Sequence, residues 1–204
     1  GKAFHSWTRG LDAPFDQKFY ACMSLTAKEL VNSIQGATIA YGQSDEISIL
    51  LKDYATYDTD AWFNGNVQKI ASVAASIATG VFNATAVKLG IDRGKLAFFD
   101  ARVFAIPQHE VVNYFIWRQQ DFHRNSIQSV GQHFMGHKKM QGLGSQDVVD
   151  ALRELEDPVD WYNDYDSVFR RGYTYQRSMD NPNFDIPEFK ALRDFIEVHV
   201  QNPV

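Results

Sequence analysis

The sequence predicts an α+β fold in which a small sheet is layered on long helices. Two short runs of β-branched and aromatic residues, 37–43 and 46–51, lie close enough together to form a hairpin. Around them, long segments carry apolar residues at steps of three and four, the period of a helix with one buried face. The expected order is helix, strand, strand, helix, strand, helix, with no internal repeat, which is typical of helices packed on a sheet.

Length and composition indicate one folded domain. The chain has 204 residues, 45% of them apolar and 14% aromatic, which excludes disorder and allows a substantial core. We expect a single domain over residues 1–204, with a helical extension from about residue 178. No uncharged apolar run approaches the roughly 20 residues that a bilayer span requires, so we expect a soluble protein without membrane contact.

Cysteine usage and the first residues favour a cytoplasmic location. The single cysteine, Cys22, excludes an intrachain disulfide and a cysteine-based zinc site, and it fits a reducing compartment. The opening GKAFHSWTRG lacks the basic, apolar and cleavage regions of a signal peptide and is typical of mid-domain sequence.

The first helix is expected over about residues 15–34 and ends before Gly36. Its apolar face consists of Phe15, Phe19, Cys22, Met23, Leu30, Val31 and Ile34. A second helical pattern, from Asp60 to Leu89, carries many small residues that would allow close packing, and Gly90 ends it.

The segment KLAFFDARVFAIP, 95–107, alternates well enough to predict a third strand that ends at Pro107. A long helix is expected over about 109–134. A shorter one follows at 146–155 with Ser145 as its cap, and a last helix over 184–200.

The stretch YGQSDEIS places two adjacent acids, Asp45 and Glu46, at the hairpin turn, where Asn-Gly or Asp-Gly would be usual. Adjacent carboxylates on a rigid hairpin are a common way to hold Mg²⁺, which prefers oxygen ligands and bridges substrate phosphates. Such a site needs a further carboxylate. Asp100 is a candidate, but Arg102 on the same face favours a structural ion pair there. From spacing alone, solvated hairpin acids are the alternative.

The net charge of −5 does not favour nucleic-acid binding, so any RNA contact would have to use local basic clusters. Three clusters exist: Lys2 with Arg9, His137-Lys138-Lys139, and Arg170-Arg171 with Arg177. For any one cluster taken alone, a solvated surface group is the favoured interpretation. The histidines of HFMGH lack the glutamate of a zinc-binding HExxH motif, and QGLGS lacks the Lys-Ser or Lys-Thr of a phosphate loop.

Taken together, several motifs resemble the tRNA-His guanylyltransferase family. They are GKAFHSW, AYGQSDEIS, FDARV, YFIWRQQDFHRNS and FRRG, in this order over roughly residues 1–177. The resemblance implies a palm domain like that of polymerases and nucleotide cyclases, with an antiparallel sheet packed on long helices. The variants APFD and HRNS are similar to the bacterial, archaeal or phage branch rather than the eukaryotic one.

The resemblance also implies a site. Asp45 would ligate two Mg²⁺ ions together with the backbone carbonyl of Gly1, and Glu46 would support it, so these acids are the expected catalytic residues. The family's first metal-binding aspartate would stand directly before Gly1, so we expect further residues N-terminal to it. Nucleotide-binding residues would be Gly1, Lys2, Ala3, Phe4, His5, Ser44, Asp45 and Lys69. An activation or second triphosphate site would contain His123, Asn125, Asn163, Arg170 and Arg171.

The implied activity is Mg²⁺-dependent activation of a tRNA 5′ end by ATP or GTP, followed by nucleotide addition in the 3′ to 5′ direction. For the branch indicated, templated repair of tRNA 5′ ends is expected. Alternatives are untemplated addition of guanosine to tRNA-His, an inactive palm that only binds RNA or nucleotide, and, last, a nucleotide cyclase. The implied partners are tRNA and nucleoside triphosphates, and the implied assembly is a homotetramer.

Overall fold

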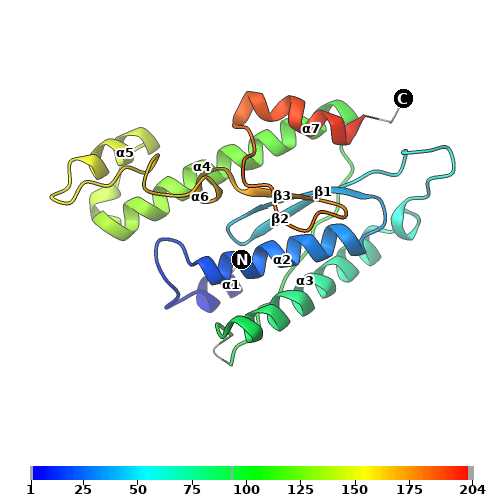
Figure 1. The fold of residues 1–204 in the computed structure, drawn as a ribbon, viewed down its shortest axis with the longest axis horizontal. Coiled ribbons are helices and arrows are strands. Elements are labelled where there is room, and N and C mark those ends of the chain that lie inside the picture. The colour runs from blue at the N-terminus through cyan, green and yellow to red at the C-terminus, as the bar shows by residue number, and fades with distance from the viewer. Residues whose placement is uncertain (1, 93, 202–204) are drawn as a thin grey trace.

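The computed structural model describes residues 2–92 and 94–201 and consists of a three-stranded antiparallel sheet between two groups of helices (Figure 1). The strands lie in the order β2-β1-β3. The elements are α1 (Lys2–Trp7), α2 (Gln17–Ser33), β1 (Ala37–Gln43), β2 (Glu46–Leu51), η1 (Trp62–Gly65), α3 (Val67–Leu89), η2 (Gln108–Glu110), α4 (Val111–Met135), η3 (His137–Met140), α5 (Ser145–Arg153), α6 (Val168–Arg171), β3 (Tyr173–Gln176), η4 (Phe189–Ala191) and α7 (Leu192–Val200).

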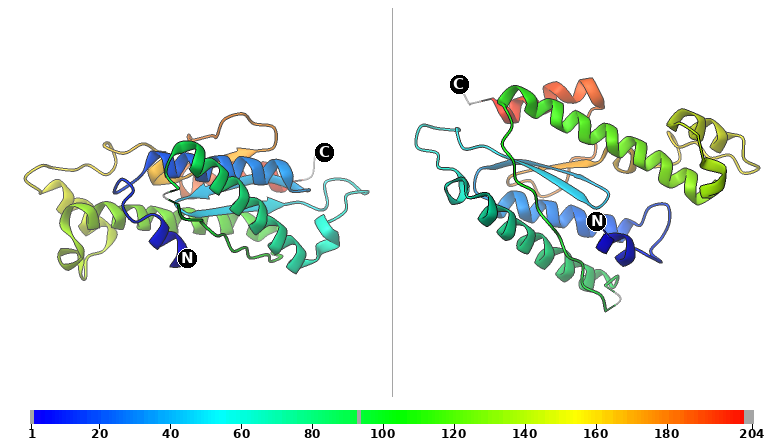
Figure 2. Two further views of the ribbon diagram at one scale, coloured as in Figure 1. Left: turned by 90° about the horizontal axis from the view of Figure 1, so that it is seen from below. Right: turned by 180° about the vertical axis from the view of Figure 1, so that it is seen from behind.

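Strand β1 is the centre of the core because its two faces are both covered. Ala37 and Ala40 pack in the cluster formed with α2 and α3, whereas Ile39 and Tyr41 pack in the cluster formed with α4 and α7. Side chains alternate along a strand, so a strand with both faces buried is apolar throughout. The sheet is therefore a middle layer, with α2 and α3 on one side and α4 and α7 on the other (Figures 1 and 2).

Side-chain caps set where the helices of the first layer begin. The Asp16 carboxylate accepts a hydrogen bond from the Phe19 amide (2.7 Å), and the Asn66 side chain accepts one from the Lys69 amide (3.1 Å). Each satisfies an amide that lacks a partner in the first turn of its helix. These caps confirm the expected first helix to within two residues and start α3 later than the predicted Asp60.

The predicted hairpin is confirmed, with Gln43 opposite Glu46 and a two-residue turn at Ser44-Asp45. Ser44 adopts a φ of 46°, in the left-handed region that two-residue hairpin turns require. On its other edge β1 pairs with β3, a four-residue strand that the sequence pattern did not predict.

The predicted strand at 95–107 is wrong, since the structure describes no strand there. Residues 97–107 cross the molecule as an extended connection between α3 and α4 (Figure 2). Side chains of α3 bond to its first part: Asn83 bonds to both backbone polar groups of Ala97, and the Thr79 hydroxyl accepts from the Phe99 amide. Asp100 lies 4.0 Å from Arg102 with both side chains over 80% exposed, so this contact contributes little to the stability of the fold.

The C-terminal half follows the predictions with shifts at the ends. The long helix is confirmed as α4, and α5 begins at Ser145, so the predicted cap is wrong by one residue. The last helix starts at Leu192 rather than at 184, because Phe189 takes a positive φ of 48° just upstream, where a helix cannot continue.

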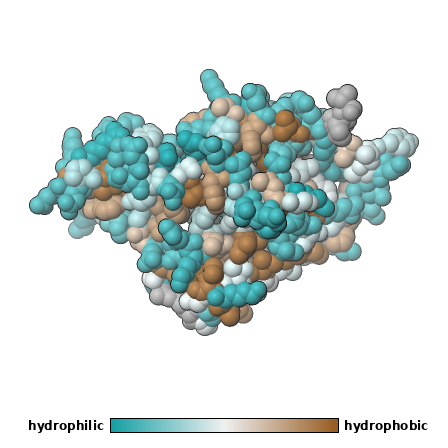
Figure 3. All heavy atoms as spheres, viewed as in Figure 1, coloured by the Kyte–Doolittle hydropathy of each residue, from teal (hydrophilic) through white to brown (hydrophobic). Residues whose placement is uncertain are grey.

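Helix α3 is, among the described residues, the one helix long and apolar enough to cross a membrane by length and composition. This finding corrects the expectation that no apolar run approaches the length of a bilayer span. Of the most apolar stretch of α3, 22% is buried, and Ala78 and Phe82 lie in the core. On the face seen in Figure 3, hydrophobic side chains gather over α2 and α3, whereas the α5 end is mostly hydrophilic.

Gly42→Ala should destabilise the fold, because the added Cβ would lie 2.1 Å from Cζ of Tyr173, whose side chain is fully buried. Overpacking of this kind costs about 3 kcal/mol of unfolding free energy. Gly80→Ala is the control, since nothing lies within 4 Å of its Cβ position, and in a helix it should stabilise by about 0.5–1 kcal/mol. Denaturant unfolding measures both. Equal stability of the two variants would contradict the Tyr173 packing.

Candidate active site

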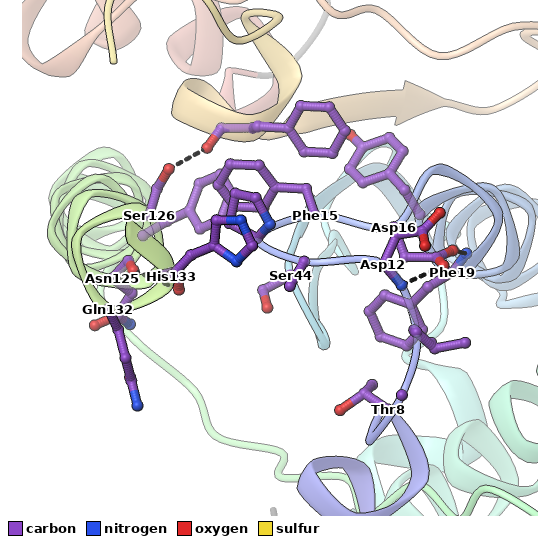
Figure 4. A pocket seen from close by; sticks show the side chains of 18 residues that line it. Thr8, Asp12, Phe15, Asp16, Phe19, Ser44, Asn125, Ser126, Gln132 and His133 are labelled. Carbon is purple, nitrogen blue, oxygen red and sulfur yellow. Dashed lines mark hydrogen bonds between the residues drawn. The ribbon is translucent and has the colours of Figure 1, made fainter. Parts of the chain in front are cut away.

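A cavity of about 480 Å³ opens between three parts of the chain: the loop before α2, the β1–β2 turn and the middle of α4 (Figure 4). Cavities of this size accommodate a nucleoside-sized molecule. The loop side contributes the ring of Phe15 together with the acids Asp12 and Asp16, and α4 contributes polar side chains. The cavity can therefore contact a ring system on one side and bond to polar groups on the other.

The loop wall is fixed by one carboxylate and one aromatic pair. Asp16 accepts hydrogen bonds from the amides of Asp12 (3.1 Å) and Phe19 (2.7 Å), which joins the loop to the first turn of α2. Phe15 stacks on Phe169 with ring centroids 4.6 Å apart and planes inclined by 8°. The loop therefore offers a preformed aromatic surface, the kind on which nucleobases stack.

The helix wall consists of polar side chains at helical spacing. Asn125, Ser129 and Gln132 lie on one face of α4 and line the cavity, and His133 adjoins them (Figure 4). The Ser126 hydroxyl donates to the Phe169 carbonyl and accepts from the Trp161 indole at 3.1 Å, so it is already bonded within the protein.

The β1–β2 turn is joined to α4 by a buried arginine. Arg118 is 9% exposed and its guanidinium lies 2.7 Å from a Glu46 oxygen and 3.2 Å from an Asp121 oxygen. When the side-chain amide of Gln43 is rotated by 180°, its nitrogen donates to the Arg118 carbonyl (2.8 Å) and its oxygen accepts from the Arg118 guanidinium (3.0 Å). Asp121 in turn lies 3.5 Å from the amide nitrogen of Asn125, so the network reaches the cavity wall.

The predicted nucleotide-binding residues are only partly brought together. Ser44 lines the cavity, and Asp45 follows it in the turn. Phe4 is buried in the core beside Trp7, and the Lys69 ammonium lies 4.4 Å from the centroid of the Phe63 ring, so neither lines the cavity. Gly1 lies outside the described residues, as do the side chains of Lys2, Ala3 and His5.

The residues predicted for a second triphosphate site separate into two places. Asn125 faces the cavity, whereas His123 lies against Trp161 and Phe189, with centroids 4.8 and 5.2 Å apart. Arg170 lies 5.8 Å from the Trp161 ring, so it shares that surface with His123.

Arg171 and Asn163 are both held by acidic residues near that surface. Arg171 donates to Glu188 at 2.7 Å, and Asn163 donates to Asp160 at 2.7 Å. The hydrogen bond from Asn163 is the main cause that lowers the pKa of the Asp160 carboxyl. Both side chains are therefore already bonded within the protein.

Burial lowers the pKa of His123 below its usual value, an effect that the nearby Glu188 opposes and Arg170 reinforces. The imidazole is therefore neutral near pH 7, and one ring nitrogen can accept a proton.

Sequence reasoning did not predict the loop residues Asp12 to Phe15 or the role of Arg118. Polar residues recur along the whole of α4, so those at 125, 129 and 132 did not stand out as the helix wall. No pattern in the loop indicated that it would form the opposite wall, because its position depends on contacts distant in sequence.

The described residues contain no group of three metal-ligating side chains. Mg²⁺ is commonly bound by one or two carboxylates, with water and substrate phosphates completing its coordination. The adjacent Asp45 and Glu46 beside the cavity are compatible with such a site, although Glu46 is engaged by Arg118.

Comparison with known proteins places these features in a family. The model of the family described as tRNAHis guanylyltransferase matches residues 1–107. An uncharacterized protein, R259, of Acanthamoeba polyphaga mimivirus is 28% identical over 80% of this chain and 63% of its own length. The tRNA(His) guanylyltransferase of Saccharomyces cerevisiae is 30% identical over 62% of this chain and 55% of its own. The chain thus spans less than two thirds of these relatives.

Two solved structures superimpose on nearly the whole of this chain. A bacterial tRNA(His) guanylyltransferase (Thg1)-like protein in complex with ATP superimposes with a TM-score of 0.91 at 41% identity, covering 97% of this chain and 86% of its own. Such a protein in complex with GTP gives 0.77 at 36% identity, with 97% and 84% covered. On the matched half of its sequence and this shared structure, the chain belongs to the tRNAHis guanylyltransferase (Thg1) family.

Proposed function

We propose that this protein is a Mg²⁺-dependent nucleotidyltransferase with a palm-type domain that activates a tRNA 5′ end and adds nucleotides in the 3′ to 5′ direction. The observation that carries the proposal is the cavity beside the Ser44-Asp45 turn. Relatives at 41% and 36% identity have been solved with ATP and GTP, which supports nucleoside triphosphates as the molecules it takes.

In this proposal the base lies against Phe15 and faces the polar side chains of α4. Asn125, Ser129 and Gln132 offer donors and acceptors to the base or ribose, while Ser44 lies at the end of the cavity next to Asp45. The triphosphate then extends toward the hairpin acids.

Asp45, supported by Glu46, would hold two Mg²⁺ ions together with the Gly1 carbonyl. Bound Mg²⁺ neutralises phosphate charge in phosphoryl transfer. The contribution of this chain is to fix the two acids on a short turn, where Arg118 holds Glu46 in place. Lys69 remains a proposed phosphate contact, although its ammonium lies over the Phe63 ring in this structure.

The proposed chemistry has two balanced steps. A 5′-monophosphate oxygen of the tRNA attacks the α-phosphorus of ATP or GTP, which forms an activated 5′ end and releases pyrophosphate. The 3′-hydroxyl of an incoming triphosphate then attacks the activated 5′ phosphorus, forms the new phosphodiester and releases the nucleoside monophosphate. Both steps depend chiefly on positioning and charge neutralisation.

The cluster around Trp161 remains the proposed activation or second triphosphate site. His123 is neutral and able to accept a proton, and Arg170 lies over the Trp161 ring nearby. Arg171 would exchange its pairing with Glu188 for a phosphate. Asn163, two residues after Trp161 in the sequence, is the remaining residue of this proposed site.

Templated repair of the tRNA 5′ end is the preferred form of the activity. It is supported by the higher identity in the structural superpositions to the bacterial Thg1-like protein, 41%, than to the Saccharomyces cerevisiae tRNA(His) guanylyltransferase, 24%. Untemplated guanosine addition to tRNA-His is the second candidate. It is supported by the 30% identity to the Saccharomyces cerevisiae tRNA(His) guanylyltransferase. A homotetrameric assembly and a cytoplasmic location complete the proposal.

Ser129→Trp should block the cavity and weaken ATP binding by at least about tenfold, because the indole would occupy the space between α4 and the loop. Calorimetric titration of ATP measures the effect. Gln128→Trp is the matched control, since this neighbouring residue does not line the cavity and should leave the affinity unchanged. ATP binding by Ser129→Trp as tight as that of the wild type would show that ATP binds elsewhere.

Asp45→Asn should reduce nucleotide addition by at least about a hundredfold, because one unit of negative charge is lost where phosphates and Mg²⁺ meet. The assay uses the full-length protein, Mg²⁺, all four triphosphates and a 5′-labelled tRNA lacking its first nucleotide. Asp58→Asn, at an exposed acid outside the cavity, is the control and should retain full activity.

Two results would contradict the proposed activity. Extension by Asp45→Asn at the wild-type rate would remove the hairpin acid from the mechanism. ATP binding without extension of any tRNA by the wild type would identify a nucleotide-binding module instead of an enzyme.

A further inference from the structure

The end of α4 and the following 3-10 helix η3 form an exposed surface of basic and aromatic side chains. Its residues, which we name the α4–η3 corner, are His133, Phe134, His137, Lys138 and Lys139, all of them exposed. The Phe134 side chain is 43% exposed and meets the His133 ring edge to face, with centroids 4.7 Å apart. Surfaces that bind single-stranded nucleic acid commonly combine exposed aromatic rings with cations.

The lysines of the corner differ from nearby arginines in their ion pairing. Arg118, Arg124 and Arg153 each pair with a carboxylate. Lys138 and Lys139 form no ion pair within residues 2–92 and 94–201. Their charge is thus available to a ligand, in a protein whose net charge is −5.

The acids of the neighbouring α5 are bonded locally. Asp147 accepts from the Gly144 amide at 2.9 Å, and Asp150 accepts from Gln146 at 3.0 Å. Both carboxylates are therefore already engaged by groups of their own helix and its start.

The corner is held by close packing. A Cβ at Gly131 would lie 2.6 Å from a Val148 methyl group and 2.8 Å from the Met140 terminal methyl, so α4, α5 and η3 meet at this glycine with little space. Gly136, with a φ of 76°, ends α4 and allows the chain to turn into η3. Met140 is buried directly after the two lysines and anchors them.

The corner is continuous with the cavity of the proposed active site. His133 belongs to both, and Gln132 lies beside it on the cavity wall (Figure 4). A polymer with its reacting end near Ser44 could therefore leave the cavity along the last turn of α4 and continue over η3.

We propose that the α4–η3 corner binds the RNA strand whose end enters the cavity, with Lys138 and Lys139 contacting phosphates and Phe134 stacking on a base. The identity of the strand as substrate rests on the proposed function. RNA suits the corner better than an acidic peptide does, because a flat exposed ring next to cations can contact a base and its phosphate together.

The test compares the double variant Lys138→Gln/Lys139→Gln with Lys88→Gln/Lys95→Gln, a matched pair of exposed lysines at the far end of α3. Fluorescence anisotropy measures binding of a 5′-truncated tRNA to the full-length protein over a range of salt concentrations. Losing two phosphate contacts should weaken binding about tenfold or more at low salt and reduce the slope of log K against log salt by about 1.5. Phe134→Ser should weaken binding without changing the slope.

The affinity for ATP is measured on the same variants and should stay at the wild-type value in each. This result would show that the α4–η3 corner and the cavity bind different ligands. Unchanged tRNA affinity and slope in the corner variant would overturn the inference, and so would an equal loss in the control pair. If the wild type binds tRNA through the corner but adds no nucleotide, the proposed activity fails while the corner stands. If the wild type binds ATP but no RNA, the corner inference is wrong.

Discussion

The ion pairs of the buried Arg118 with the half-exposed Glu46 and Asp121 join the two halves of the site. Removing a guanidinium from water is costly, and the cost is offset only when carboxylates surround it with good geometry. Here Glu46 comes from the hairpin and Asp121 from α4, at 2.7 and 3.2 Å. Ser44 stands two residues before Glu46, and Asn125 bonds to Asp121. The distance across the cavity therefore depends on one cation between two acids.

This arrangement gives the two adjacent acids of the turn different surroundings. Glu46 is bonded to a buried cation that fixes the start of β2, whereas Asp45 lies at the tip of the turn, next to the cavity-lining Ser44. A two-residue turn leaves little freedom, since Ser44 already occupies the left-handed region. Glu46 therefore anchors the hairpin to α4, and this places the neighbouring Asp45 beside the cavity.

The sequence predicted the fold well where a periodic pattern met a clear end signal. The helices α2 and α4 and the hairpin between residues 37 and 51 appear with small shifts, because buried faces and caps are encoded locally. The strand expected at 95–107 did not form for a tertiary reason. The side chains of Asn83 and Thr79 bond to the start of this segment, and none of the strands that the structure describes pairs with it. The four-residue strand β3 is too short for a pattern to detect.

The site was predictable only in part, for the same reason. Ser44 and Asn125, which the motifs assigned to two different sites, line the same cavity, whereas His123 and Arg170 meet at Trp161. Phe4 packs in the core instead, since an aromatic ring on a short amphipathic helix is buried whenever the fold offers apolar neighbours. The stacking of Phe15 on Phe169 joins residues far apart in sequence, and no local pattern encodes such a contact.

The central claim is that the cavity between the loop, the hairpin and α4 holds the nucleoside triphosphate. A crystal structure of the full-length protein with ATP tests it most directly. The claim predicts the adenine ring against Phe15, polar contacts from Asn125 or Ser129, and the phosphates directed at Ser44 and Asp45. ATP ordered only at the Trp161–Arg170 surface, with this cavity filled by water, would contradict it.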